Sequence, residues 1–273
     1  MSRLSPELDY VQSVLDCRSV EQVWSIYSAK MLEFGFDRLI FAVNRFRASG
    51  DFGDPSDALV LTNHEKCYID IFLGQGLYTK APMAIWVVNN LGSCSWQWAE
   101  DRRKNGLNTD SENKILDLNE KMDITAGYSI SFEDISERSA SGIGLCAKRG
   151  LTQAEVDDIW SRVGSEIETY SKVMNHKICT LPFERPGTPL TDRQREVLQW
   201  VADGKTVQDV ATILGLGQAT VEKHLRRARE NLNAETTAQA VLKAAIQNQF
   251  FLFRGNKGKD GPEYIAFSAQ KLP

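Results

Sequence analysis

The residues best suited to chemistry lie near the C-terminus, where basic side chains recur at helical spacing. At about 100° per residue, Lys223, Arg226 and Arg227 fall opposite the apolar stripe of a helix predicted over residues 217–232. An arginine can donate two parallel hydrogen bonds to guanine, and both residue types bind phosphate. The pattern therefore predicts a helix that enters the major groove of double-stranded DNA. The candidate DNA-binding residues are Thr220, Val221, Lys223, His224, Arg226 and Arg227.

Two further predicted helices position this basic helix. Thr191, with Gln194 three residues later, is typical of a helix N-cap, and the helix that it starts ends at Gly204. Thr206 begins a second, short helix, which stops at the glycine-containing turn 215–217. Apolar residues on all three helices can form a small core. The order predicts an all-α helix-turn-helix domain over residues 190–250.

The segment 181–189 divides the chain. It holds three prolines and a glycine, which stop helices and disfavour central strands. We expect a linker there, with a first domain over residues 1–180 and the helical domain over residues 190–250. Residues 251–273 are then a C-terminal extension, for which a loose terminus, a short strand and a clasp onto the neighbouring domain all stay open.

The first domain shows both helical and strand periodicity. Helices are predicted over residues 6–15, 20–34, 65–72, 82–90, 112–121 and 152–178, and strands over 39–43, 58–61, 128–132 and 142–147. That order predicts an α+β fold with an antiparallel sheet flanked by helices. The last helix carries a narrow apolar stripe from Val156 to Met174. The stripe either packs on its own sheet or contributes to a homodimer interface.

Composition and charge narrow the function classes. The net charge of −4 divides into an acidic excess over residues 1–187 and a basic excess over residues 188–273, which fits a protein that contacts DNA with one domain. The three histidines lack metal-ligand spacing, and the five cysteines contain no C-x-x-C pair, so we predict no metal site and no disulfide framework. No nucleophile arrangement or phosphate-binding loop indicates an enzyme. With no apolar run of about 18 residues, we expect a cytoplasmic protein without a membrane segment.

The helical domain resembles the helix-turn-helix of LuxR-type regulators. The resemblance rests on Leu190-Thr191, Glu196-Val197-Leu198, Ala202, Gly204-Lys205-Thr206, Val210-Ala211, Leu214-Gly215, Thr220-Val221, His224 and Leu232. The chain differs from the family pattern at Gly217, where a capping serine is common, and at Asn231, where a lysine is common. Glu222 stands where some relatives present a basic residue, which bears on the operator sequence and not on the fold.

The first domain resembles the acyl-homoserine-lactone-binding domain of quorum-sensing LuxR-type proteins, which folds as a three-layer α-β-α sandwich. The family's tryptophan, tyrosine, aspartate-proline pair and second tryptophan correspond to Tyr68, Phe72, Ala81-Pro82 and Trp96. In the family, the aspartate accepts a hydrogen bond from the ligand amide N–H, which Ala81 cannot do. The resemblance implies ligand-binding roles for Tyr68, Phe72, Tyr78, Pro82, Trp96 and Ser129.

Together these features predict a LuxR-type DNA-binding transcriptional regulator related to quorum sensing. We expect a homodimer that binds an inverted repeat of double-stranded DNA. The expected signal is a hydrophobic small molecule, either an acyl-homoserine lactone or an atypical ligand, and no other cofactor is predicted. Two alternatives stay open. One is a ligand-independent regulator controlled by a protein partner or by dimerisation; the other is an adaptor without DNA binding, since Glu222 and Glu230 dilute the basic face.

Overall fold

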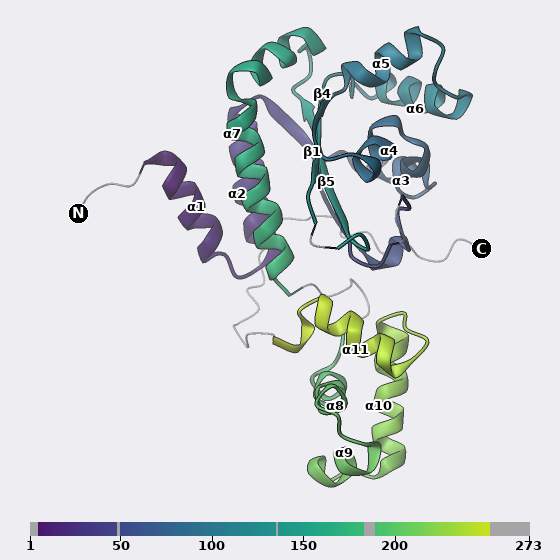
Figure 1. Ribbon diagram of the computed structural model, residues 1–273. Helices are drawn as coiled ribbons and strands as arrows, with labels where there is room; N and C mark the ends of the chain where they lie inside the picture. The colour runs from purple at the N-terminus through teal and green to yellow at the C-terminus, as the bar shows by residue number, and fades with distance from the viewer. Residues whose placement is uncertain (1–4, 48–49, 135, 183–188, 252–273) are drawn as a thin grey trace. The chain divides into compact units, whose positions relative to one another are not determined.

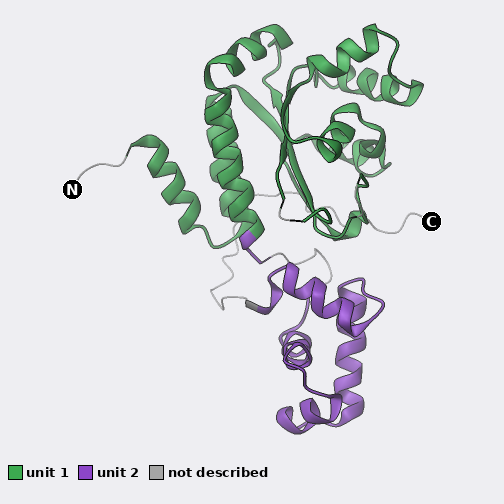
Figure 2. Cartoon of the chain, viewed as in Figure 1, with its two compact units in different colours: residues 1–179, 262–273 green, residues 180–261 purple. Residues whose placement is uncertain are grey.

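The computed structural model describes residues 5–47, 50–134, 136–182 and 189–251 (Figure 1). These residues form two compact units that divide between Cys179 and Thr180 (Figure 2). Most of the predicted linker, residues 183–188, and residues 252–273 of the predicted C-terminal extension lie outside the described residues.

A five-stranded antiparallel sheet is the centre of the first unit. Its strands are β1 (Phe36–Asn44), β2 (Ala58–Thr62), β3 (Gly92–Ser95), β4 (Gly127–Phe132) and β5 (Ala140–Ala147), in the spatial order β2-β1-β5-β4-β3. Successive side chains of a strand point to opposite faces. Phe41 and Val43 of β1 are therefore buried on one face, whereas Ile40 and Ala42 point to the other face, where they line a cavity.

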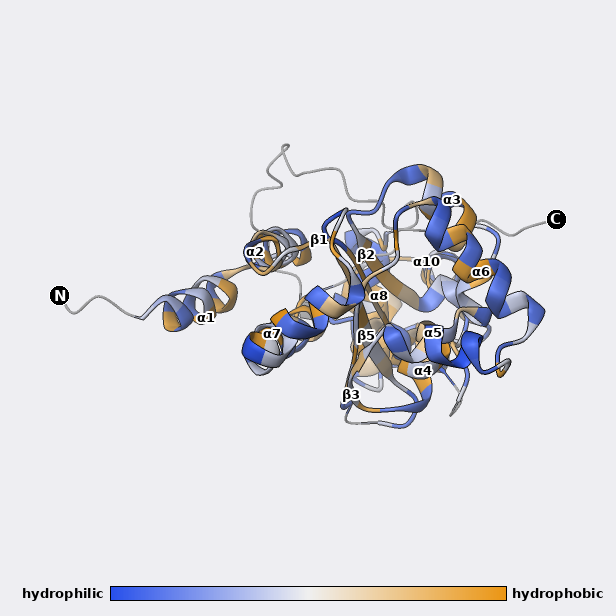
Figure 3. Ribbon diagram, turned by 90° about the horizontal axis from the view of Figure 1, so that it is seen from above, coloured by the Kyte–Doolittle hydropathy of each residue, from blue (hydrophilic) through white to orange (hydrophobic). Residues whose placement is uncertain are grey.

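Helices cover both faces of this sheet, as Figure 1 and Figure 3 show from two directions. On one face lie α2 (Val20–Glu33) and α7 (Gln153–Thr180), and α1 (Pro6–Asp16) contacts α2. On the other face lie α3 (Lys66–Phe72), α4 (Pro82–Asn89), α5 (Gln97–Lys104) and α6 (Asp110–Lys121). Two 3₁₀ turns, η1 (Pro55–Asp57) and η2 (Leu77–Lys80), complete the unit. The predicted α-β-α sandwich with an antiparallel sheet is confirmed.

The apolar stripe of α7 is buried inside its own unit. Val156, Tyr170 and Met174 are each at most 3% exposed. The Trp160 ring stacks on the ring of Tyr128 in β4, with centroids 3.8 Å apart. Of the two readings of this stripe, the structure therefore supports packing on its own sheet.

The second unit is a helical bundle. Its helices are α8 (Asp192–Ala202), α9 (Val207–Leu214), α10 (Gln218–Asn231) and α11 (Thr237–Ile246), followed by the 3₁₀ turn η3 (Gln249–Phe251). The hydroxyls of Thr191 and Thr206 accept hydrogen bonds from the backbone N–H groups of Gln194 and Asp209, which confirms both predicted helix starts. Gly215 ends α9 with φ +63°, in the left-handed region that favours glycine.

One strand and two α-helices were missing from the sequence prediction. The strand β3 contains only glycine, serine and cysteine, which give little strand signal, and it forms by pairing with the edge of β4. The helix α5 buries a single residue, Ala99, so it shows no apolar stripe. The helix α11 buries Ala240 and Ala244, whose small side chains give a weak periodic signal.

Candidate functional site

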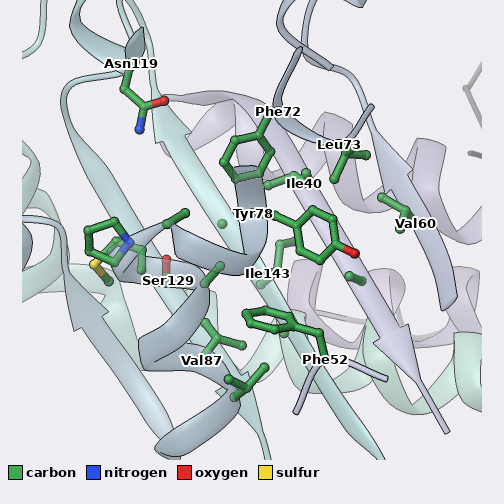
Figure 4. A pocket seen from close by; sticks show the side chains of 18 of the residues that line it. Ile40, Phe52, Val60, Phe72, Leu73, Tyr78, Val87, Asn119, Ser129 and Ile143 are labelled. Atoms are coloured by element: carbon green, nitrogen blue, oxygen red, sulfur yellow. The ribbon is translucent and has the colours of Figure 1, made fainter. Parts of the chain in front are cut away.

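A cavity of about 660 Å³ lies between the sheet and the helices on its second face (Figure 4). The sheet contributes Ile40, Ser129 and Ile143 to its wall, and α3 and α4 contribute Phe72 and Val87. Most lining residues are apolar. A cavity of this size and character falls in the usual range of about 300–1,000 Å³ for small-molecule sites.

The cavity wall contains every residue for which the sequence predicts a ligand-binding role. These residues are Tyr68, Phe72, Tyr78, Pro82, Trp96 and Ser129. They come from α3, η2, α4, the segment between β3 and α5, and β4, so the fold brings together residues that are distant in sequence. Two neighbouring tryptophans, Trp86 and Trp98, are not among the lining residues. The Trp98 ring instead lies 5.0 Å from the Arg102 guanidinium.

Aromatic side chains form a stacked ladder beside the cavity. The rings of His64 and Tyr68 lie 5.1 Å apart, and those of Tyr68 and Phe72 also lie 5.1 Å apart. Tyr68 and Phe72 lie four residues apart on one face of α3, and His64 lies just before the start of that helix. The Tyr68 hydroxyl donates a hydrogen bond to Oδ1 of Asn119 in α6, at 3.1 Å. Burial raises the pKa of Tyr68, so this hydroxyl keeps its proton.

The Trp96 indole is fixed by a hydrogen bond and by close packing. Its Nε1 donates to Oγ of Ser129 at 3.0 Å. A Cβ added to Gly127 would lie 3.0 Å from the Trp96 ring and 2.2 Å from the Leu145 carbonyl oxygen. A side chain at position 127 would therefore collide with the backbone of β5 and press against the indole. Gly127, the first residue of β4, thus has a packing role that its sequence position alone did not reveal.

Ala81 occupies the position at which the resemblance places an acidic hydrogen-bond acceptor. It is 5% exposed, lines the cavity and starts α4 without a side-chain capping bond. A methyl group can neither donate nor accept a hydrogen bond. A ligand N–H at this point of the wall would find no acceptor on residue 81.

Many other lining residues escaped the sequence prediction, and four of them are considered in detail because they are polar or belong to loops. They are His64, Asn119, Phe52 and Arg47. The Phe52 ring packs edge-to-face against Tyr78 at 5.4 Å, which brings the loop before β2 to the cavity. These residues form no motif, because they belong to separate loops and helices. The one available signal was the spacing of four residues between His64 and Tyr68.

His64 is the most unusual polar group in the wall. It is 8% exposed, and its Nδ1 is buried without a hydrogen-bond partner among the described residues. Desolvation by burial, together with the nearby Arg38 guanidinium, lowers the pKa of His64 to about 4. The imidazole is therefore neutral at neutral pH.

In the second unit, α10 presents a basic face. Thr220, Lys223, Arg226 and Arg227 are exposed, and His224 is half-buried. Partial burial and the neighbouring cations, among them Arg227 and Lys223, lower the pKa of His224 below its ordinary value. This face carries donors and positive charge that can meet phosphates and base edges.

Acidic residues also lie on this helix. The guanidinium of Arg226 pairs with the Glu230 carboxylate at 3.0 Å, and both side chains are more than half exposed. Such an exposed pair is weak, so it leaves Arg226 available to a stronger partner. Glu222 is exposed near the start of the helix.

One predicted DNA-binding residue is placed differently by the structure. Val221 is fully buried in the core of the second unit with Leu225 and Ala228. Its side chain supports α10 from inside and is not available to DNA. The 3.6-residue periodicity of this helix already places Val221 on the apolar side with Leu225 and Ala228, about opposite Lys223, and that side is the one the structure buries.

Comparison with known proteins assigns each of the two units to a protein family. Residues 19–178 match the autoinducer binding domain, and residues 188–244 match the luxR family of bacterial regulatory proteins. The chain is 24% identical to the transcriptional activator protein LuxR of Aliivibrio fischeri over 194 residues, which cover 70% of this chain and 74% of that protein. It is 40% identical to the transcriptional activator protein BjaR1 of Bradyrhizobium diazoefficiens over 60 residues, or 22% of this chain and 25% of that one.

Among solved structures, the chain is similar to CepR2 of Burkholderia cenocepacia, an N-acylhomoserine lactone dependent LuxR family transcription factor. The TM-score is 0.50 at 13% sequence identity, over 63% of this chain and 92% of that chain, which shows a likeness of fold. Within the described ranges, no helix is long and apolar enough to cross a membrane. The chain belongs to the LuxR-type DNA-binding transcriptional regulators, with an autoinducer-binding domain ahead of a LuxR-family helix-turn-helix.

Proposed function

We propose that this regulator binds a hydrophobic small molecule in the cavity of its first unit and acts in the cytoplasm as a homodimer on an inverted repeat of double-stranded DNA. The ligand is an acyl-homoserine lactone or an atypical molecule of similar size. The observation that carries this proposal is the mainly apolar cavity of about 660 Å³, whose wall contains all six predicted ligand-binding residues.

The energetic basis of ligand binding is the transfer of apolar surface out of water. Each methylene group that enters an apolar site contributes about 0.8 kcal/mol. Aliphatic and aromatic residues such as Ile40, Val60 and Phe72 provide the surface that would receive an acyl or aryl tail. Many ligands with an apolar tail could gain this binding free energy. The polar groups of the wall would then decide which of them binds most tightly.

For DNA binding, we propose different roles for the exposed residues of α10. Arg226 reads a base edge, whereas Lys223 and Thr220 hold phosphates and Arg227 adds positive charge. In a homodimer, two α10 helices would occupy major-groove sites about one helical turn apart, so the operator would share the two-fold symmetry of the protein.

Two binding measurements on the full chain test the proposal. A promoter fragment with an inverted repeat should bind with an affinity that falls steeply as salt rises, because phosphate contacts release counterions. N-octanoyl homoserine lactone should raise the thermal unfolding temperature of the first unit, since a ligand that binds only the folded state stabilises it. An affinity independent of salt would contradict the DNA role. If no acyl amphiphile stabilises the protein, the ligand role is wrong.

One observation favours the alternative of a ligand-independent regulator. Ala81 supplies no acceptor where the family pattern has an aspartate. A buried ligand amide left unpaired there would cost about 1–3 kcal/mol, or about ten- to a hundredfold in affinity. Stable, salt-sensitive DNA binding by protein that carries no ligand would support this alternative.

A further inference from the structure

Asp157 of α7 lies at the centre of a hydrogen-bond network on the face of the sheet opposite the cavity. Its Oδ1 accepts hydrogen bonds from Ser95 Oγ and the Tyr128 hydroxyl, both at 2.8 Å, and from Nε2 of Gln153 at 2.9 Å. Burial and this carboxylate raise the pKa of Tyr128 to about 12, so the hydroxyl keeps its proton. A carboxylate only accepts hydrogen bonds, so it orients all three donors.

The Ser95 hydroxyl extends this order to the turn before α5. Because it donates to Asp157, its oxygen accepts, and the backbone N–H of Gln97 donates to it at 3.2 Å. Trp96 lies between these two residues. Successive side chains of an extended strand point to opposite faces, so Ser95 contacts α7 while Trp96 lines the cavity. Two directed hydrogen bonds therefore connect Asp157 to the backbone on either side of the indole.

Gln153 holds the neighbouring strand at the same level. Its Oε1 accepts a hydrogen bond from the N–H of Gly127 at 2.9 Å, and its Nε2 donates to the carbonyl oxygen of Gly127 at 3.2 Å. That carbonyl also accepts the backbone N–H of Trp96 at 3.0 Å. The indole packs directly against Gly127, since a Cβ there would lie 3.0 Å from the ring. Gln153 therefore fixes the backbone on which the indole rests.

The strand that leads to Trp96 has few contacts of its own. β3 has four residues with small or no side chains, lies at the edge of the sheet and pairs only with β4. Such a short edge strand is weakly held by its own ladder. A second contact from α7 supports this strand, because Ser93 Oγ donates to Oε1 of Glu168 at 2.6 Å. α7 thus provides the anchor that β3 lacks.

We propose that Asp157 and Gln153 are positioning residues for the ligand-binding wall, which hold the Trp96 indole from the opposite face of the sheet. Neither residue is among the described residues that line the cavity, so both act through Ser95 and Gly127. This inference rests on the proposed function, since it assumes that a small molecule meets the indole.

The first test follows the indole in the full chain without ligand. The six tryptophans are replaced by 5-fluorotryptophan, and Trp96→Phe identifies the fluorine NMR resonance of Trp96. Asp157→Ala should shift and broaden this resonance, because the turn loses its acceptor. The resonance of Trp200, in the second unit, should not move. An unchanged Trp96 resonance in folded Asp157→Ala protein would overturn the proposal.

Two control variants of the same helix separate positioning from stability. Asp158→Ala removes an exposed carboxylate that forms a surface ion pair, and it should leave the Trp96 resonance in place. Ser171→Ala removes a buried hydrogen bond of 2.8 Å to a tyrosine hydroxyl, so it should lower the unfolding temperature without moving that resonance. An equal shift in Ser171→Ala and Asp157→Ala would show that the network acts only through the stability of the fold.

Two milder variants decide the question if Asp157→Ala does not fold. Ser95→Ala cuts the link from the network to the turn and should also shift the Trp96 resonance. Asp157→Asn keeps one acceptor oxygen and should leave the resonance near its wild-type position. An unshifted resonance in Ser95→Ala would contradict the proposal.

Ligand binding is then measured by calorimetry with N-octanoyl homoserine lactone. Asp157→Ala should weaken binding about tenfold, whereas Asp158→Ala should leave it unchanged. If the lactone binds wild-type and Asp157→Ala protein equally, the ligand function stands and the positioning role is wrong. If it does not bind the wild type although Asp157→Ala moves the Trp96 resonance, the network positions the indole and the proposed ligand function is contradicted.

Discussion

The two units of this regulator place their candidate functional groups in opposite ways. The second unit puts Lys223 and Arg226 on the outside of α10, supported by a core in which Val221 is fully buried. The first unit puts its functional groups inside, on the wall of a cavity, where polar atoms such as Nδ1 of His64 are out of reach of water. Surface groups can change without strain on the fold, whereas each polar atom in the cavity must be satisfied by the protein or by a ligand.

This difference explains why the two units depart from their family pattern in different ways. In α10, Glu222 replaces a residue that is basic in some relatives, and the helix still packs on its core through Val221. In the cavity, Ala81 supplies no acceptor at the position where the family pattern has an aspartate, so any ligand would depend on the other polar atoms of the wall. We expect substitutions to show the same contrast.

The largest effect should follow when a charge is placed in the core of the second unit. Val221→Asp buries an unpaired carboxylate and should lower the free energy of unfolding of this unit by about 4 kcal/mol or more. DNA binding should be lost, while ligand binding in the first unit should remain. Calorimetric unfolding and gel-shift titration measure both effects. Gln218→Asp, an exposed change on the same helix, is the control and should leave stability almost unchanged.

A pH titration tests the interior of the first unit. His64 has a pKa of about 4 in the folded state, below its ordinary value of 6.5. As pH falls from about 6.5 to 4, the unfolded chain binds a proton at His64 and the folded chain does not. The free energy of unfolding should therefore fall as pH drops through this window, by about 3 kcal/mol at pH 4. Above about pH 6.5, His64 should not change the free energy of unfolding with pH.

The variant His64→Phe should remove this part of the pH dependence in urea unfolding. A wild-type pH profile that matches the His64→Phe profile would show that this imidazole is not desolvated.

At the surface of α10, the expected effect depends on the base sequence. Arg226→Ala should cost about 1–3 kcal/mol, or about ten- to a hundredfold, on the preferred operator. Binding to unrelated DNA should fall much less. Competition gel shifts with single-base operator variants measure the difference, and Arg226→Lys tests whether charge alone is enough. A uniform loss on all sequences would assign Arg226 to the phosphate backbone.

Lys223→Ala should give the smallest effect. If Lys223 contacts phosphate, its removal weakens binding to all sequences by a similar, modest factor and lowers the salt slope by about one unit. Titration at several salt concentrations measures that slope. A change in base preference with an unaltered slope would move Lys223 from phosphate contact to base reading.

Sequence patterns predicted the helices and strands around the cavity better than the polar side chains in its wall. Periodicity and capping residues located four of the five strands, α7 and the first three helices of the second unit, because apolar spacing and N-caps are local signals. The family motif located Tyr68, Phe72 and Trp96 in the cavity wall. The partnership of Tyr68 with Asn119 could not be predicted, since it joins α3 to α6 through a side-chain contact that no spacing rule describes.

The most direct test of the account is native mass spectrometry of the full chain purified from its own host. The account predicts a dimer that carries a noncovalent, uncharged apolar molecule. The same ligand should be absent from Ala42→Phe protein, in which the larger side chain fills part of the cavity where Ala42 lines it. A ligand-free wild-type dimer that still binds its operator would contradict the account and show that the cavity is not a sensor.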